Sequence, residues 1–201
     1  MRFFYNSSDE KFTRLKRIEE RHPEIAAEVP PFNQQQVVIK RVHDDWYNTG
    51  DKKNWEDFLT ALKTNKTWVA GWDDKNAWFN FPLMQNDAVL GDAERLCPKT
   101  IAMLRNPEML GINIAGFALL LPHSKLPTHT DTTGPSYNSV AVNMLLSGSN
   151  SHLHVGPDAS YAHELGKAVV FNSEYPHCAT NNGDTNRVIL YIDMKLDHKS
   201  S

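Results

Sequence analysis

Short apolar runs separated by turn residues fill the second half of the chain. From about residue 112 onward, these runs alternate with clusters of Gly, Pro, Asn and Ser, the pattern typical of short strands joined by turns. The predicted strands span residues 114–121, 140–146, 167–171 and 187–192. Three earlier runs predict further strands at 37–39, 67–70 and 77–81. The pattern therefore predicts a mainly β core in the C-terminal half.

Helical periodicity is confined to the first half of the chain. Phe12, Leu15 and Ile18 recur on one helical face, and Pro23 interrupts or restarts that helix. Proline is favoured in a first helical turn, so Pro98 indicates another helix start. The predicted helices span residues 7–29, 55–62 and 98–105. We interpret them as scaffold that packs on the outside of the β core.

These elements predict a small sandwich or barrel with flanking N-terminal helices. A chain of 201 residues has the usual size of one domain and can bury a sizeable core. No repeat, low-complexity tract or linker divides it. We expect a single domain over residues 1–201, with a helical and mixed part at 1–110 and the β core at 111–195.

Charge and cysteine content narrow the range of partners. The net charge of -3 comes from interspersed acids and bases without a basic stripe, so no nucleic acid partner is expected. Cys97 and Cys178 lack C-x-x-C spacing and indicate reduced thiols. No run of about 18 apolar residues occurs, and the N-terminus turns polar too early for a signal peptide. We therefore expect a cytoplasmic protein with no membrane partner.

Candidate chemistry begins with His129 and Asp131. Residues i and i+2 of an extended segment share a face, so both side chains can reach one metal ion. His177 follows 48 residues after His129 and completes two histidines and one carboxylate. This facial triad suits Fe(II) and leaves positions open for a co-substrate and oxygen. The alternatives are turn capping by Asp131 and an ordinary hydrogen-bonded role for His177.

Arg187 lies ten residues after His177, at the start of the last apolar strand. A guanidinium on a strand with two buried faces needs a partner, and a dicarboxylate co-substrate can supply it through paired hydrogen bonds. The alternative is a buried salt bridge to Asp193 or Glu174. A second H-x-D pair, at residues 43–45, lies in a charged segment, and we interpret it as surface.

Several segments resemble the aspartyl/asparaginyl β-hydroxylase family. They are 78–83 (WFNFPL), 97–100 (CPKT), 116–122 (GFALLLP), 152–156 (HLHVG), 166–177 (GKAVVFNSEYPH) and 187–193 (RVILYID). The resemblance implies a double-stranded β-helix, the cupin-like jelly roll of 2-oxoglutarate oxygenases. It also implies that His177 is the distal iron ligand and that Arg187 anchors 2-oxoglutarate.

The chain departs from that family's pattern in two places. Where aspartyl hydroxylase members carry an iron-binding histidine in an R-x-H-L segment, this chain has Asn143, a poor replacement. Those members lack a ligating carboxylate, whereas Asp131 makes this chain more similar to the free-proline hydroxylases of the same superfamily. His154 matches a position where family members often have a co-substrate-binding Arg. We therefore include Asn143 and His154 as candidate co-substrate contacts.

The resemblance implies an oxygenase that uses Fe(II), 2-oxoglutarate and O2, with ascorbate as reductant, and hydroxylates a C–H bond of an amino acid, free or in a peptide. Two rival hypotheses remain open. One is a cupin-type metalloenzyme that needs no 2-oxoglutarate, such as an isomerase, and the other is a jelly-roll binding module without catalysis. The spacing from His177 to Arg187 argues against the first, and the complete triad argues against the second.

Overall fold

The computed structural model describes residues 3–36, 68–71, 77–109, 111–131 and 139–195. Three sequence predictions lie outside these ranges: the strand at 37–39, the helix at 55–62 and the second H-x-D pair at 43–45.

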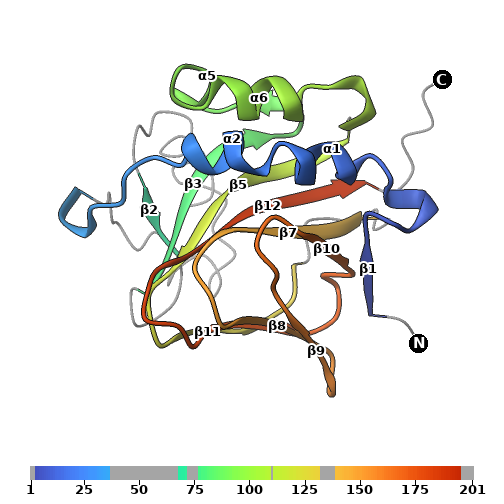
Figure 1. Cartoon of the computed structure of the whole chain (residues 1–201), viewed down its shortest axis with the longest axis vertical. Helices are drawn as coiled ribbons and strands as arrows, with labels where there is room; N and C mark the ends of the chain where they lie inside the picture. The colour runs from blue at the N-terminus through green and yellow to red at the C-terminus, as the bar shows by residue number, and fades with distance from the viewer. Residues whose placement is uncertain (1–2, 37–67, 72–76, 110, 132–138, 196–201) are drawn as a thin grey trace, which may run out of the picture.

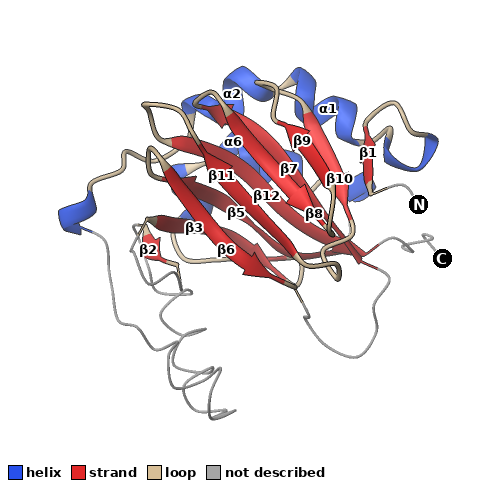
Figure 2. Cartoon of the chain, turned by 90° about the horizontal axis from the view of Figure 1, so that it is seen from below, coloured by secondary structure: helices blue, strands red, loops and turns tan. Residues whose placement is uncertain are grey.

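Eight consecutive strands form two facing antiparallel sheets (Figures 1 and 2). They are β5 (Ile112–Leu120), β6 (Ser124–His129), β7 (Ser139–Ser147), β8 (Ser151–Val155), β9 (Ala159–Ala162), β10 (Ala168–Phe171), β11 (His177–Asn181) and β12 (Arg187–Lys195). The larger sheet has the order β10-β7-β12-β5 and the smaller one β6-β11-β8-β9. Because most successive strands cross between the sheets, the chain forms a double-stranded β-helix, as the sequence predicted.

Further short strands extend the larger sheet at both edges. They are β1 (Phe4–Asn6), β2 (Val69–Ala70), β3 (Trp78–Gln85) and β4 (Ala88–Val89). β1 pairs with β10 at one edge, and β3 pairs with β5 at the other. The predicted strands at 67–70 and 77–81 are thus confirmed as β2 and β3. The N-terminal segment contributes to the jelly roll itself, which its sequence did not indicate.

The helices cover the outer face of the larger sheet (Figure 1). They are α1 (Leu15–Glu20), α2 (His22–Ala27), α5 (Ala93–Leu96) and α6 (Pro98–Leu104), with 3-10 turns at Glu10–Phe12, Gln34–Gln36 and Pro107–Met109. The helical segment predicted over 7–29 is interrupted next to Pro23, as predicted, because Arg21 leaves helical geometry and Pro23 lies in the first turn of α2. Its first α-helix begins at Leu15 and not at residue 7. No helix among the described residues is long and apolar enough to span a bilayer.

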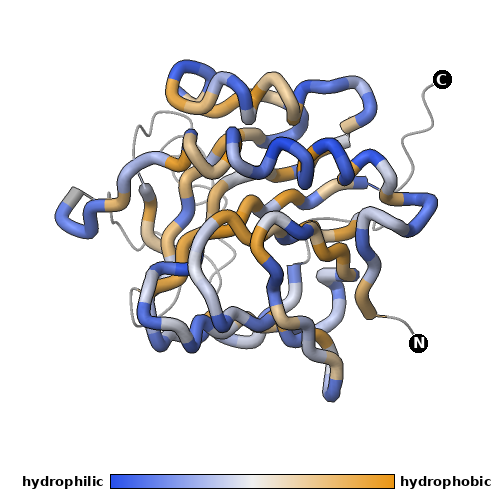
Figure 3. The backbone as a smooth tube through the Cα atoms, in the orientation of Figure 1, coloured by the Kyte–Doolittle hydropathy of each residue, from blue (hydrophilic) through white to orange (hydrophobic). Residues whose placement is uncertain are grey.

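The two faces of the larger sheet have different characters. Val142, Val170 and Leu190 belong to the main hydrophobic core beneath the helices. The opposite face, between the sheets, carries a smaller apolar cluster and several buried polar side chains. The two sheets also differ in hydropathy, with apolar strands in the larger sheet and a more polar smaller sheet (Figure 3). Buried polar groups need partners, so the space between the sheets is the place to look for chemistry.

Candidate metal centre and its surroundings

The two sheets bring His129, Asp131 and His177 together. His129 ends β6 and His177 begins β11, and the two residues are paired across neighbouring strands. His177 is thus the first residue of a strand and not part of the turn before it. Asp131 follows β6, and its backbone N–H donates to the carbonyl of Ser173 at 3.0 Å. The strand pairing therefore fixes the positions of both imidazoles, and the Ser173 contact fixes the turn that carries the carboxylate.

The three side chains are spaced to share one ion. Nε2 of His129 lies 3.5 Å from Oδ1 of Asp131, and Nε2 of His177 lies 3.5 Å from Oδ2. All three potential ligand atoms lie within 4.8 Å of one another. Metal–ligand bonds of roughly 2.1 Å at right angles separate neighbouring ligands by about 3 Å. A movement of a few tenths of an ångström would bring the carboxylate oxygens to that spacing.

Backbone carbonyls orient both imidazoles. Nδ1 of His129 donates to the carbonyl of Pro127 at 2.8 Å, and Nδ1 of His177 donates to the carbonyl of Tyr175 at 2.9 Å. A carbonyl oxygen can only accept, so each Nδ1 carries a proton, and in the neutral ring each Nε2 presents a lone pair. This is the tautomer that a metal ligand needs. Sequence reasoning did not find these carbonyls, although in each case the acceptor lies two residues before the histidine.

Burial and neighbouring charges shift the pKa of two of the three proposed ligands, His129 and Asp131. Burial lowers the pKa of His129, and the nearby His177 lowers it further, so the neutral imidazole is favoured. For Asp131, burial on its own would raise the pKa, but hydrogen bonds and charge from His177 outweigh burial and the pKa is lowered. A charged carboxylate beside two imidazole nitrogens suits a divalent cation.

Tyr191 on β12 is a functional candidate that the sequence analysis missed. Its hydroxyl donates to Oδ2 of Asp131 at 2.8 Å. Burial raises the pKa of Tyr191 well above its ordinary value, and the charge of Asp131 adds to this, so the phenol keeps its proton. In the sequence, Tyr191 is one aromatic residue in an apolar strand, where it is indistinguishable from core. In the structure it holds the carboxylate toward the two histidines.

Replacing Tyr191 by Phe should weaken metal binding roughly tenfold, because partners behind metal ligands typically contribute that much or more to affinity. Mn(II) affinity measured by competition with a chelator tests this. Tyr161→Phe is the matched control, since Tyr161 packs against the same apolar cluster but its hydroxyl forms no hydrogen bond with Asp131 among the described residues. Equal Mn(II) affinity in the Tyr191→Phe variant and the control would show that the phenol does not position Asp131.

Arg187 lies in the same interior at the other end of the strands. It is 2% exposed, its Nε donates to Oγ of Ser151 at 2.9 Å, and its Nη2 has no partner in the described part of the chain. Burial lowers the pKa of Arg187 to about 10, which leaves it charged at neutral pH. Within the described residues it forms no ion pair with either proposed rival partner. Glu174 is exposed, and Asp193 accepts a hydrogen bond from Asn113.

The two remaining sequence candidates face opposite ways. Asn143 on β7 is paired with Tyr191 and faces the interior, where its Oδ1 is buried without a partner among the described residues. His154 on β8 alternates with the buried Leu153 and instead lies on the outer face, with its ring 6.2 Å from that of His152. His154 is therefore not brought together with the site, because strand alternation turns it away. Asn143 remains a candidate for contact with the co-substrate.

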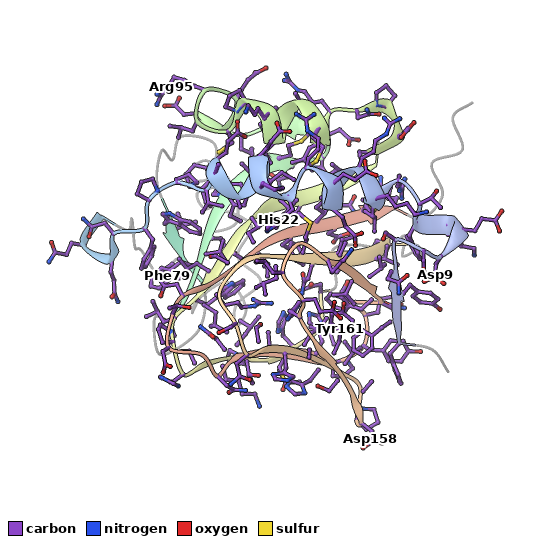
Figure 4. The ribbon with its side chains drawn as sticks, viewed as in Figure 1. Asp9, His22, Phe79, Arg95, Asp158 and Tyr161 are labelled. Atoms are coloured by element: carbon purple, nitrogen blue, oxygen red, sulfur yellow. The ribbon has the colours of Figure 1, made fainter. Side chains whose placement is uncertain are left out.

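His163, which the sequence analysis did not consider, occupies the interior beside Ser151. Its Nδ1 lies 3.1 Å from Oγ of Ser151, and its Nε2 is buried without a partner among the described residues. Burial, together with the charge of Arg187, lowers the pKa of His163 to about 2, so the imidazole is neutral. Tyr161, labelled in Figure 4, packs edge-on against this ring at 5.9 Å.

The depressed pKa of His163 predicts a measurable loss of stability in acid. The unfolded chain binds a proton at His163 below its ordinary pKa of 6.5, whereas the folded chain does not. The free energy of unfolding is therefore unaffected by the titration of His163 above pH 6.5 and falls as the pH drops from 6.5 toward 2. Between about pH 7.5 and about pH 5.5, wild type should lose about 1.3 kcal/mol more than His163→Gln. Urea unfolding of metal-free protein measures this, and equal losses would contradict the assignment.

A jelly roll that holds two imidazoles and a carboxylate within reach of one ion has the architecture of a cupin-type metalloprotein. Comparison with known proteins is more specific. The family model for aspartyl/asparaginyl beta-hydroxylase matches residues 19–196. The chain belongs to the aspartyl/asparaginyl β-hydroxylase family, as the sequence motifs indicated.

Two curated relatives are similar to most of this chain. "Uncharacterized protein L888" of Acanthamoeba polyphaga mimivirus is 30% identical over 165 residues, which is 82% of this chain and 58% of that protein. "Ornithine lipid ester-linked acyl 2-hydroxylase" of Rhizobium tropici is 27% identical over 187 residues, which is 91% of this chain and 57% of that protein. The chain thus spans less than two thirds of the length of either relative.

Solved structures with a similar fold include cupin domains. One is the Cnp3 cupin domain of Schizosaccharomyces pombe, with a TM-score of 0.36 and 10% identity over 42% of this chain and 56% of that one. Another is the cupin domain of an XRE family transcriptional regulator from Enterobacter cloacae, with a TM-score of 0.38 and 14% identity over 59% of this chain and 96% of that one.

Proposed function

We propose that this protein is an Fe(II)- and 2-oxoglutarate-dependent oxygenase that hydroxylates a C–H bond of an amino acid, free or within a peptide. The observation that carries the proposal is the pairing of two interior features. One is the cluster of His129, Asp131 and His177, and the other is the buried cation of Arg187, which has an open hydrogen-bonding position. Membership of a hydroxylase family supports the same reaction class.

The donor set fits Fe(II). Two neutral imidazoles and one carboxylate are the facial triad of non-haem iron oxygenases, and three protein ligands leave coordination positions for other molecules. Bound Fe(II) with 2-oxoglutarate and O2 would supply the oxidising power for C–H hydroxylation, with succinate and CO2 as co-products. In this account Pro127 and Tyr175 orient the imidazoles through their carbonyls, and Tyr191 orients the carboxylate.

The polar interior fits a dicarboxylate co-substrate. Nη2 of Arg187, Nε2 of His163, Oδ1 of Asn143 and Oγ of Ser173 are buried without partners among the described residues. Each such atom destabilises the folded state unless a ligand or a water molecule forms the missing hydrogen bond. A charged guanidinium that forms no ion pair with any described carboxylate favours an anionic ligand most strongly. This argues against the rival hypothesis of a cupin-type metalloenzyme that needs no 2-oxoglutarate.

The three proposed ligands differ in exposure. The side chain of His177 is 5% exposed, that of His129 is 13% exposed and that of Asp131 is 23% exposed. Phe171 packs edge-on against His177, with ring centroids 5.1 Å apart. We propose that the substrate approaches over Asp131, the most exposed of the three. Phe171 keeps water from the face of His177 that it covers.

An acyl chain is a second candidate substrate. The Rhizobium tropici relative, which aligns with 91% of this chain, is named for hydroxylation at position 2 of an ester-linked acyl group. Phe3, Phe4, Tyr161 and Tyr175 form a partly buried apolar cluster with Phe171, the residue that packs on His177. Such a surface favours contact with hydrocarbon over a free polar amino acid.

Succinate release tests the proposal and separates the two substrates. Full-length protein purified without oxygen receives Fe(II), ascorbate, 2-oxoglutarate and air, with free amino acids, Asp-, Asn- and Pro-containing peptides, or acyl-ester lipids. We expect iron-dependent succinate that rises with one substrate class, accompanied by a hydroxylated product. Succinate no higher than in the His177→Ala variant under every condition would contradict the proposed function.

A further inference from the structure

We infer that His163 is a second anchor for the distal carboxylate of the co-substrate, acting with Arg187 through the shared hydroxyl of Ser151. The inference rests on the proposed function and deepens it, because it assigns a binding residue that the sequence motifs do not include. Its basis is the hydrogen-bonded chain Arg187–Ser151–His163, in which the two outer members each keep one unfilled buried nitrogen.

The inference assigns His163 the tautomer with its proton on Nε2, which the hydrogen bonds of Ser151 accommodate. Nε of Arg187 is always a donor, so Oγ of Ser151 accepts from it at 2.9 Å. The hydroxyl then has its own proton to give, and Nδ1 of His163 lies 3.1 Å away. Because the ring is neutral, an accepting Nδ1 leaves the proton on Nε2. In this tautomer, Nε2 of His163 is a buried N–H donor without an acceptor among the described residues.

The guanidinium of Arg187 presents a second donor at the other end of this hydrogen-bonded series. Nε and Nη2 form one edge of the guanidinium, and such edges bind carboxylates through two parallel hydrogen bonds. Here Ser151 occupies the position opposite Nε, while Nη2 is buried and unfilled. A carboxylate that reaches this end of the interior would find one donor on Arg187 and another on His163, the charge being supplied by Arg187 alone.

The scaffold holds this end of the interior in place. Asn181 on β11 is fully buried, and its side chain donates to the carbonyls of Leu120, Leu121 and Thr185, which ties β11 to the ends of neighbouring segments. The backbone N–H of His163 donates to the carbonyl of Ser151 at 2.8 Å and fixes the two residues side by side. The donors are therefore preorganised before any ligand binds.

Ligand truncation combined with residue truncation tests the inference. Calorimetry under argon on the Mn(II)-loaded full-length chain compares 2-oxoglutarate with 2-oxopentanoate, which carries a methyl group in place of the distal carboxylate. His163→Phe removes the donor and should weaken 2-oxoglutarate roughly tenfold, as expected for a hydrogen bond to a charged group. It should leave 2-oxopentanoate unchanged. His163→Gln, which places an amide N–H near the Nε2 position, should retain most of the affinity for 2-oxoglutarate.

The outcomes separate this inference from the proposed function. If Arg187→Leu loses the preference for 2-oxoglutarate while His163→Phe keeps wild-type affinity, His163 is not an anchor and the proposed function stands. Equal weakening of both ligands in His163→Phe would mean a purely structural role and would also overturn the inference. If wild type itself does not prefer 2-oxoglutarate over 2-oxopentanoate, the proposed co-substrate is wrong and the inference fails with it.

Discussion

His177→Ala should abolish metal binding and with it all 2-oxoglutarate turnover. His177 is the most buried of the three ligands, and its Nε2 is already directed toward Asp131 by the carbonyl of Tyr175. Loss of a ligand should weaken binding by roughly a thousandfold or more, well beyond the 10–100-fold that partners behind the ligands contribute. Mn(II) affinity by chelator competition and succinate release both measure the effect.

His154→Ala is the matched control for that variant. It removes an imidazole from neighbouring strand β8, but on the outer face of the smaller sheet. Metal affinity and succinate release should stay at the wild-type level in this control. Wild-type Mn(II) affinity in His177→Ala would mean that the ligand assignment is wrong, whatever its activity.

Arg187→Leu should raise the 2-oxoglutarate requirement about a hundredfold or more while leaving Mn(II) affinity within a few-fold of wild type. Removing one member of a buried charge pair costs roughly 2–5 kcal/mol, and Arg187 is the cation at this end of the interior for which the described residues supply no counter-charge. The separation of the two effects follows from geometry, because Arg187 contacts Ser151 and none of the three proposed metal ligands.

Arg187→Lys refines this prediction. It retains the positive charge but loses the planar donor edge, so its 2-oxoglutarate requirement should lie between those of wild type and Arg187→Leu. The 2-oxoglutarate dependence of succinate release gives these values. An unchanged requirement in Arg187→Leu would remove Arg187 from the co-substrate site and would favour a cupin-type enzyme that does not use 2-oxoglutarate.

The central strands of the larger sheet were predictable from sequence, and the strands of the smaller sheet were not. Strands β5, β7, β10 and β12 are buried on both faces, so they appear as continuous apolar runs. The strands of the smaller sheet have one face toward solvent and are only four to six residues long, which leaves too few positions for a clear alternation. β6 also contains Pro127, which argues against a strand in any sequence pattern.

The candidate site was predictable where residue type carried the signal. His129, Asp131 and His177 are metal-ligand types at a suggestive spacing, and the structure brings them together. Tyr191 and His163 were missed because their importance lies in which face of a strand they occupy and in what lies opposite. Those facts depend on pairing between distant strands. His154 was assigned by motif position, and one step of strand alternation places it on the wrong face.

A diffraction experiment on crystals of the full chain grown under argon with Mn(II) and 2-oxoglutarate tests the central claim most directly. Anomalous scattering near the manganese edge locates the ion without reference to any assumed ligand. We expect one strong peak between Nε2 of His129, Nε2 of His177 and the carboxylate of Asp131, with 2-oxoglutarate density extending from it to Arg187. An ion bound elsewhere, or an interior empty of 2-oxoglutarate at saturating concentration, would contradict the account.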